Sequence, residues 1–466
     1  MVLPARTLKE VTEMYERYHL PKKDLPLAEK PFAKNAVIRD DRCMNCGRCV
    51  DQCIYGVHER NAKDPRVMAE PKAYLCKNCL RCVENCPQRA LTVQYSDEYT
   101  SLGVGIWTPT RVTTIWNESQ AGKLPVYGAG YRGKFAAPGY DSMWTDMSEI
   151  VRPTRDGIHG REYISTSVDL GKRVDHLEFD KAGKLLTEMP KFVELPLPMM
   201  MDVSRSRDLI SGPFEGLIKA AATLGTLLFF PAEVKLPEIP ANAVASLVPV
   251  FSPGRTSVAT VISPSIVEFE MSSGWKNDLA SLNARFPKAI VSARVEAGEG
   301  VEKVALELVS GGIDIIHLLY DEQGQEKGTR RLAKDSLLAI NKALANESVR
   351  ESVSIIAAGG LAAAEHVPKS LICGADAVVL EQALKVAMGC TGGPTCTICP
   401  MDGSKISPEQ TYWRVVNMVG AWRDQLLEVM GAMGIREARR LRGETGRAIF
   451  YEDAERDAFA NIQGGA

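Results

Sequence analysis

The stretch CMNCGRCVDQC (residues 43–53) is followed by a second stretch with the same cysteine spacing, CKNCLRCVENC (residues 76–86), and then by Pro87. Both stretches read Cys-x2-Cys-x2-Cys-x3-Cys, and a tandem run of this kind is the ligand set of two [4Fe–4S] clusters. In such runs the fourth cysteine of each stretch ligates the other cluster. The spacing therefore predicts two ligand sets: Cys43, Cys46, Cys49 and Cys86 for one cluster, and Cys76, Cys79, Cys82 and Cys53 for the second.

Zinc sites and a disulfide framework are the other interpretations of these cysteines. Zinc sites usually take cysteines in pairs rather than as a triplet plus one. A four-cysteine spacing of this kind would hardly occur twice in one chain by chance. Many reduced thiols are typical of the cytoplasm, where we expect this chain to be located. The cysteines thus predict a protein that transfers electrons.

The composition is that of an ordinary globular protein and excludes several classes of function. The 466 residues are 45% hydrophobic and 24% charged, with a formal net charge of −2. A protein that binds nucleic acid needs a concentrated basic face, so we expect no nucleic-acid partner. No apolar stretch reaches the ~18–20 residues of a transmembrane helix, and the first ten residues lack the apolar segment of a secretion signal.

The residue pattern changes along the chain and predicts five parts. The cysteine stretches lie in a small domain whose outer strands we expect at residues 36–39 and 90–94. The five parts are an N-terminal arm (1–35), a two-[4Fe–4S] ferredoxin-like domain (36–95), an extended connector (96–191), a barrel with an iron–sulfur site (192–405) and a C-terminal helical tail (406–466).

The part from residue 192 to residue 405 has the pattern of βαβ units, because short apolar runs alternate with helical stretches such as 301–310 and 331–346. Eight strands in this order predict an α/β fold, the (β/α)8 TIM-type barrel. A doubly wound open sheet is the alternative, but no Gly-x-Gly-x-x-Gly follows the first strand. The predicted strands are 197–203, 226–230, 243–251, 266–271, 289–296, 313–319, 354–358 and 377–380.

A third group of cysteines, Cys390, Cys396 and Cys399, follows the last predicted strand. Three closely spaced cysteines suit a [3Fe–4S] cluster, or a [4Fe–4S] cluster with an outside fourth ligand. A zinc site and a redox-active Cys-x2-Cys pair remain open alternatives. Cys373 stands apart from the group, and we expect it to be a small core residue.

Two Gly- and Ala-rich segments, IIAAGGLAAAEHV (355–367) and CGADAVVL (373–380), are typical of the last two strand ends of a phosphate-binding barrel. At such strand ends, backbone N–H groups hold the phosphate of a flavin or a substrate. Gly359 and Gly360 would let the backbone approach the anion. Segments of this composition also occur without a ligand.

The order of several segments resembles the FMN-binding domain of glutamate synthase, in the archaeal type that carries two ferredoxin clusters ahead of the barrel. The resemblance covers residues 36–445 and depends on order and spacing more than on invariant motifs. The segments are STSVDLG (165–171), VSARVEAGEGVEKVALELVSGGIDII (291–316), AAGGL (357–361), GADAVVLEQAL (374–384), MGC (388–390) and the helical stretch 415–443.

This resemblance implies an iron–sulfur flavoprotein that aminates 2-oxoglutarate or a related oxo acid, with a [3Fe–4S] cluster on Cys390, Cys396 and Cys399. It implies that Arg294 binds a substrate carboxylate and that Lys276 acts near the flavin. Ammonia and electrons would come from partners: another redox or amidotransferase subunit, and a ferredoxin or an NAD(P)H-oxidising subunit. The residues implied to bind FMN are Met200, Lys276, Gly359, Gly360 and Gly374.

Several residues depart from the family pattern. Arg294 replaces the lysine of the family's VSVKL, and the two side chains are not equivalent. The segment SGWKNDLAS (273–281) keeps Lys276 but loses the family's glycines. Glu381 lies where the FMN phosphate would bind, and like charges repel. These departures favour a second hypothesis, a non-catalytic electron-transfer subunit of a larger redox complex with a degenerate substrate site.

Overall fold

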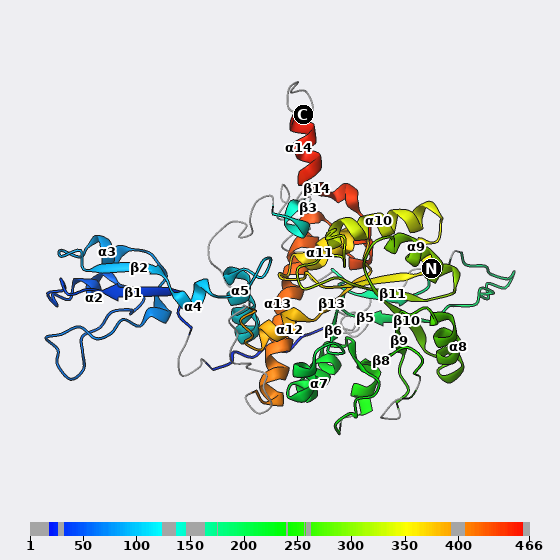
Figure 1. Cartoon of the computed structure of the whole chain (residues 1–466), viewed down its shortest axis with the longest axis horizontal. Helices are drawn as coiled ribbons and strands as arrows, with labels where there is room; N and C mark the ends of the chain where they lie inside the picture. Colours follow the sequence, from blue (N-terminus) through cyan, green and yellow to red (C-terminus); the bar gives the residue numbers. More distant parts are fainter. Residues whose placement is uncertain are drawn as a thin grey trace, which may run out of the picture. The chain divides into compact units, whose positions relative to one another are not determined.

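The computed structural model describes residues 18–26, 32–123, 137–145, 164–174, 176–238, 241–255, 257, 262–392 and 406–459 (Figure 1). The chain divides into two compact units. The larger unit contains Met1–Asp24, Ile115–Cys390 and Cys399–Ala466, and the smaller unit contains Leu25–Thr114 and Thr391–Ile398.

The smaller unit is built on a two-stranded antiparallel sheet. Strand β1 (Asn35–Arg39) pairs with β2 (Leu91–Tyr95), so that the two ends of the cysteine-rich segment are held together. These strands coincide with the outer strands expected from the sequence. The shorter elements of the unit are α2 (Arg48–Gln52), η1 (Ala73–Leu75), α3 (Arg81–Glu84) and α4 (Asp97–Thr100).

The larger unit contains a closed barrel of eight parallel strands, in which β13 lies next to β6. The predicted barrel is therefore confirmed, and each predicted run overlaps one strand. The strands are buried on both faces, which explains why they read as continuous apolar runs. They are β6 (Met199–Asp202), β7 (Leu228–Pro231), β8 (Leu247–Phe251), β9 (Ile266–Glu270), β10 (Ile290–Glu296), β11 (Ile315–Leu319), β12 (Ser354–Ala358) and β13 (Ala377–Leu380).

Helices occupy most of the connections between the barrel strands. Helix α9 (Val301–Ser310) coincides with a predicted helix, and its buried residues Val301, Ala305 and Leu308 lie on one face because of their i, i+4, i+7 spacing. The other connecting helices are α6 (Arg207–Ser211), α7 (Phe214–Leu224), η6 (Ala241–Ser246), α8 (Trp275–Arg285), α10 (Ala333–Asn346), η7 (Arg350–Ser352) and α11 (His366–Ile372), and α12 (Gln382–Ala387) follows the last strand.

The tail begins with the long helix α13 (Pro408–Met433), as the sequence predicts. Ser407 and Gln410 form a capping box, because each side chain bonds the other residue's backbone N–H at 3.1 Å. No helix in the described part of the chain is both long and apolar enough to cross a membrane. The remaining tail elements are η8 (Ala438–Leu441), η9 (Thr445–Arg447), β14 (Ala448–Phe450) and α14 (Tyr451–Phe459).

Residues 96–191 contain a helix that the sequence did not predict, α5 (Pro109–Ala121). Its buried residues include Val112 and Ile115, but also Glu118 and Ser119. Polar residues therefore interrupt the hydrophobic periodicity of the buried face, and the sequence pattern does not predict a helix here. The same stretch contains η2 (Gly139–Ser142), β3 (Met143–Thr145), which pairs with β14, and β4 (Val168–Gly171), which pairs with β5 (Phe192–Leu195). The five predicted domain boundaries stay predictions.

Candidate cluster sites and barrel centre

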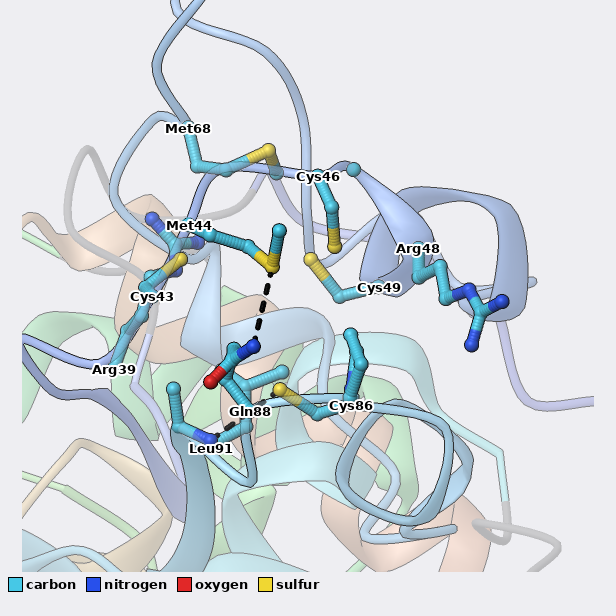
Figure 2. A pocket seen from close by; sticks show the side chains of 13 residues that line it. Arg39, Cys43, Met44, Cys46, Arg48, Cys49, Met68, Cys86, Gln88 and Leu91 are labelled. Carbon is cyan, nitrogen blue, oxygen red and sulfur yellow. Dashed lines mark hydrogen bonds between the residues drawn. The ribbon is translucent and has the colours of Figure 1, made fainter.

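Four cysteines of the smaller unit line one pocket: Cys43, Cys46, Cys49 and Cys86. Figure 2 shows their sulfur atoms around a common space, whereas the side chain of Arg48 points away from it. Three of the thiols come from the segment around the start of α2, and the fourth follows α3. The structure thus brings together the four residues that the spacing assigns to one cluster.

The other four cysteines also lie close to one another. Burial, and then repulsion from the thiolates of Cys76, Cys53 and Cys79, raises the pKa of Cys82 to about 11. Burial likewise raises the pKa of Cys76, and Cys79 and Cys53 add to this effect. Thiolates crowded in this way repel one another unless metal ions lie among them. The donor set therefore fits an iron–sulfur cluster, whose presence stays a prediction.

The two cysteine loops repeat one backbone conformation. Asn45 and Asn78, each two residues after the first cysteine of a stretch, both have a φ of 55°. Gly47 and Leu80, each four residues after it, have φ values of 83° and 60°. A left-handed φ is unfavourable for a side chain as large as leucine. That Leu80 nevertheless adopts this φ indicates that the loop needs this backbone shape, as do concave backbone turns that bind anions.

Backbone N–H groups donate to three of the thiols. The N–H of Val57 lies 3.4 Å from Cys53 Sγ, that of Asn78 3.4 Å from Cys76 Sγ, and that of Ala90 3.3 Å from Cys86 Sγ. Such bonds stabilise a thiolate and help to set the reduction potential of a bound cluster. They are a second feature of the unit that fits iron–sulfur ligation.

The third cysteine group lies largely outside the described residues. Cys390 is described and half-buried. Cys396 and Cys399 fall in the stretch 393–405, which the structure does not describe. The third cluster therefore stays a prediction. Cys373 is fully buried, with its Sγ 3.7 Å from the sulfur of Met143, as expected for a core residue.

A charged cluster fills the interior of the barrel. One carboxylate oxygen of Glu268, on β9, accepts a hydrogen bond from Arg294 Nε at 2.6 Å. The other oxygen accepts one from Ser292 Oγ at 2.7 Å and lies 2.9 Å from His317 Nδ1. Arg294 Nη2 also lies 2.9 Å from a carboxylate oxygen of Asp202, on β6. Alternation along β10 places Ser292 and Arg294 on the same inner face. All five side chains are buried.

The members of this cluster stabilise one another's charges. Burial alone would raise the pKa of Glu268, but the attraction of Arg294 and His317 outweighs it and lowers the pKa to about 2. Burial opposes the charge of Arg294, yet Asp202 and Glu268 hold its pKa above the usual range. Buried charges of this kind are tolerated only with their partners in place. Glu268 and Arg294 therefore stay ionised inside the barrel.

Nε2 of His317 has no hydrogen-bond partner among the described residues. The residue is fully buried, and the ring of Phe229 lies with its centroid 5.1 Å from the imidazole. Leaving a buried polar atom unpaired costs about 1–3 kcal/mol. This nitrogen is therefore one of the buried atoms of the cluster that could form a hydrogen bond with a bound group, together with Arg294 Nη2 and Asp202 Oδ2.

The two residues predicted to act on the substrate occupy different surroundings. Arg294 already faces the carboxylates of Asp202 and Glu268, so an acid substrate would have to compete with them. Lys276 is exposed in the first turn of α8, with Nζ 5.5 Å from the centroid of the Trp275 ring. The roles of Arg294 and Lys276 stay predictions.

Gly359 and Gly360, implied to bind FMN, follow the carboxyl end of β12 and have φ values of 99° and 70°. A Cβ atom on Gly359 would lie 2.5 Å from the carbonyl oxygen of Tyr320, and one on Gly360 would lie 2.5 Å from the Cα of Gly324. Close packing against the loop after β11 thus requires glycine at both positions, whether or not a ligand binds.

Gly374 is separated from these glycines, whereas Met200 and Lys276 stay predicted FMN contacts. Gly374 precedes β13 and so lies at the amino end of the barrel, opposite to Gly359, whereas Met200 is buried within β6. Glu381 follows β13 at the carboxyl end, where its carboxylate accepts a hydrogen bond from Arg205 at 2.5 Å. A phosphate here would meet this carboxylate, so these residues do not fit an FMN phosphate unless Glu381 is displaced.

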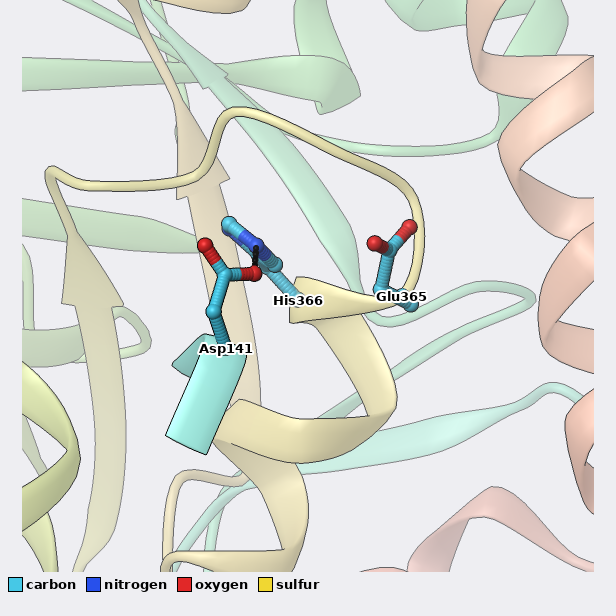
Figure 3. A group of neighbouring side chains, drawn as sticks. All are labelled: Asp141, Glu365 and His366. Atoms are coloured by element: carbon cyan, nitrogen blue, oxygen red, sulfur yellow. Dashed lines mark hydrogen bonds and ion pairs between the residues drawn. The ribbon is translucent and has the colours of Figure 1, made fainter. Parts of the chain in front are cut away.

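Asp141, Glu365 and His366 form a further group of potential metal ligands, with their donor atoms all within 4.8 Å of one another. Figure 3 shows Asp141 facing His366, whose Nε2 lies 3.4 Å from the carboxylate. The N–H of Ala362 donates to the other ring nitrogen at 3.2 Å. Because both nitrogens already have protein partners, we interpret the group as an internal contact between α11 and η2.

One motif was missed in the sequence. The segment GAGYRG (128–133) has the Gly-x-Gly-x-x-Gly spacing, but no predicted strand and helix flank it, as a dinucleotide site would require. It lies outside the described residues. The charged barrel cluster was also missed, because its members come from separate strands and have no common motif.

Comparison with known proteins links the barrel to one family. Residues 252–436 match the family model described as the conserved region in glutamate synthase. The chain is 26% identical to the archaeal glutamate synthase [NADPH] of Archaeoglobus fulgidus, over 90% of this chain and 94% of that protein. It is 24% identical to the archaeal-type glutamate synthase [NADPH] of Dehalococcoides mccartyi, over 87% of this chain and 92% of that protein.

Among solved structures, the chain is similar to a mutant flavocytochrome b2 with benzoylformate, at 11% identity and a TM-score of 0.44. That match covers 79% of this chain and 87% of the flavocytochrome chain. A likeness at this level carries no inference about function.

Proposed function

Because this chain belongs to the glutamate synthase family, we propose that it is an iron–sulfur oxidoreductase for the reductive amination of 2-oxoglutarate or a related oxo acid. Electrons would enter through the smaller unit and be used in the barrel. The observation that carries the proposal is the gathering of eight cysteines into two sets of four, in the spacing of [4Fe–4S] ligands. When bound, the clusters would supply one-electron transfer.

In this proposal the residues of the barrel cluster handle protons. Glu268 holds His317 through Nδ1, which leaves Nε2 of the imidazole to exchange a proton with a bound substrate. Arg294 keeps Glu268 ionised, so that the histidine has a fixed partner. Arg294 and Lys276 remain the residues proposed to contact the substrate acid and the flavin.

The proposal also includes partners. The relatives named above are described as NADPH enzymes, which supports an NAD(P)H-oxidising subunit or a ferredoxin as the electron donor. Ammonia would come from a separate amidotransferase subunit. We place the protein in the cytoplasm, where its thiols would stay reduced.

A second candidate function is a non-catalytic electron-transfer subunit. Two observations favour it: Arg294 is already neutralised by two protein carboxylates, and Glu381 occupies the end of the barrel where a phosphate would bind. Both would arise if the substrate and flavin sites had degenerated while the cluster ligands were kept.

Flavin binding by the Glu381→Ser variant separates the two candidate functions. The substitution removes the carboxylate and frees Arg205 for a phosphate, so we expect FMN to bind at least about tenfold more tightly, or about 1.4 kcal/mol. FMN released by acid precipitation of the anaerobically purified chain should be below one per chain in the wild type and closer to one in the variant.

The matched control is Glu347→Gln, which removes an exposed carboxylate at the end of α10 and should leave the flavin content unchanged. If neither the wild type nor Glu381→Ser binds FMN, the electron-transfer function is favoured. Unchanged FMN affinity in a flavin-containing variant would show that Glu381 does not face the phosphate.

A further inference from the structure

We propose that Arg39 gives the two cluster sites different reduction potentials, by holding a fixed positive charge against the site of Cys43, Cys46, Cys49 and Cys86. The inference rests on the proposed iron–sulfur function. It assigns a positioning role to a residue that lies outside both cysteine stretches.

Arg39 is the last residue of β1 and lines the same pocket as the four thiols (Figure 2). One end of its guanidinium, Nη1, donates to the carbonyl oxygen of Ala69 at 3.0 Å. Its Nε and Nη2 atoms are buried and have no hydrogen-bond partner among the described residues. An arginine stays charged in proteins, so these two donors lack an anionic acceptor that the pocket would provide with a cluster in place.

The second cysteine stretch provides an internal comparison. Lys72 stands four residues before Cys76, as Arg39 stands four residues before Cys43. However, the side chain of Lys72 is 41% exposed, and its Nζ lies 2.6 Å from a carboxylate oxygen of Glu59. Solvent and Glu59 thus offset the charge of Lys72, whereas the charge of Arg39 lies in the pocket.

His58 does not change the difference in positive charge between the two cluster sites. It is buried, with neither ring nitrogen hydrogen-bonded within the described part of the chain. Burial, and then the charge of Arg39, lowers its pKa, so the imidazole is neutral near neutral pH and adds no second positive charge. Arg39 is then the residue that distinguishes the sites, because among the described residues of the smaller unit no other cation has buried donor atoms without hydrogen-bond partners.

A reduced cluster carries one more negative charge than an oxidised one, so a nearby fixed cation favours the reduced state and raises the potential. Electrons on the smaller unit should therefore reside mainly on the cluster of Cys43, Cys46, Cys49 and Cys86. A tenfold change in the ratio of reduced to oxidised cluster corresponds to about 59 mV for one electron.

The test is an anaerobic redox titration of the full chain followed by electron paramagnetic resonance. We expect Arg39→Gln to lower the reduced-to-oxidised ratio of one cluster at least tenfold at a fixed solution potential, about 59 mV. Arg39→Lys keeps the charge and should retain most of the wild-type ratio. Lys72→Gln is the matched control, with a change of less than about twofold, since its charge is screened by solvent.

Combining Arg39→Gln with a cysteine variant of one set shows which cluster site has the changed potential. With Cys79→Ala, which removes a ligand of the other set, the remaining cluster should still respond to Arg39→Gln. With Cys46→Ala, which removes a ligand of the set beside Arg39, the potential of the remaining cluster should not respond to Arg39→Gln. If Arg39→Gln loses iron, Arg39→Met, which is also neutral and is similar in length, takes its place and should show the same lowered ratio.

Unchanged potentials in Arg39→Gln with both clusters present, or equal shifts from Lys72→Gln, would overturn the role of Arg39 and leave the proposed function intact. Absence of cluster signals from the reduced wild-type protein would instead overturn the proposed function.

Discussion

Cys46→Ala is expected to lower the iron content by about one to four atoms per chain, because the three remaining thiolates can hold a [3Fe–4S] cluster at most. Cys46 lines the pocket with three other thiols and is exposed, so removal of its side chain creates no core cavity. Cys79→Ala should cause the same loss from the other set. Iron analysis and the resonance signal of the reduced protein measure both losses.

Cys373→Ala is the matched control. Its thiol is fully buried against Met143 in the larger unit and belongs to none of the proposed ligand sets, so the iron content should stay at the wild-type level. The double variant Cys46→Ala/Cys79→Ala should lose about two to eight iron atoms per chain, twice the loss of each single variant. Finding about one zinc atom per chain in place of iron would contradict the cluster assignment.

Glu268→Gln is expected to destabilise the larger unit by about 3–5 kcal/mol, the cost of removing one partner from a buried ion pair. Glu268 holds Arg294, Ser292 and His317 together, and without its charge Arg294 would lose one of the two carboxylates that it contacts directly and would keep Asp202. Denaturant unfolding at pH 7, followed by circular dichroism, measures the difference.

The same variant tests the charge of Glu268 through pH. Because the folded state lowers the pKa of Glu268 from 4.5 to about 2, its contribution is full above about pH 4.5 and is lost as the pH falls toward 2. The gap in unfolding free energy between the wild type and Glu268→Gln should therefore narrow on acidification. Glu296→Gln, at the exposed end of β10, is the control and should cost less than about 1 kcal/mol. If Glu268→Gln also lowered the free energy of unfolding by less than about 1 kcal/mol, the ion-pair account would be contradicted.

The barrel and the cysteine sets could be predicted because their signals are local. Strand β11 is buried at every position, so Ile315–Leu319 stands out as an apolar run. The ligand sets follow from a spacing in which the fourth cysteine crosses over. Neither inference needs knowledge of distant contacts.

The barrel centre could not be predicted, since its partners meet only when the barrel closes. In the sequence, Arg294 appears as a lone cation in VSARV, which invites a substrate role. In the structure, Asp202 from β6 and Glu268 from β9 reach it. Arg39 was missed for a related reason, because its importance depends on two donors left without partners among the described residues of the folded pocket.

The central claim, that electrons from the eight-cysteine unit reduce an oxo acid in the barrel, is tested most directly by reoxidation of the reduced full-length protein under anaerobic conditions. The protein is first reduced with dithionite, and excess reductant is removed. We expect 2-oxoglutarate with ammonium to bleach the reduced-cluster signal and yield glutamate, whereas ammonium alone should leave the signal intact. A signal that persists with both reactants present, in protein that contains iron and flavin, would contradict the claim.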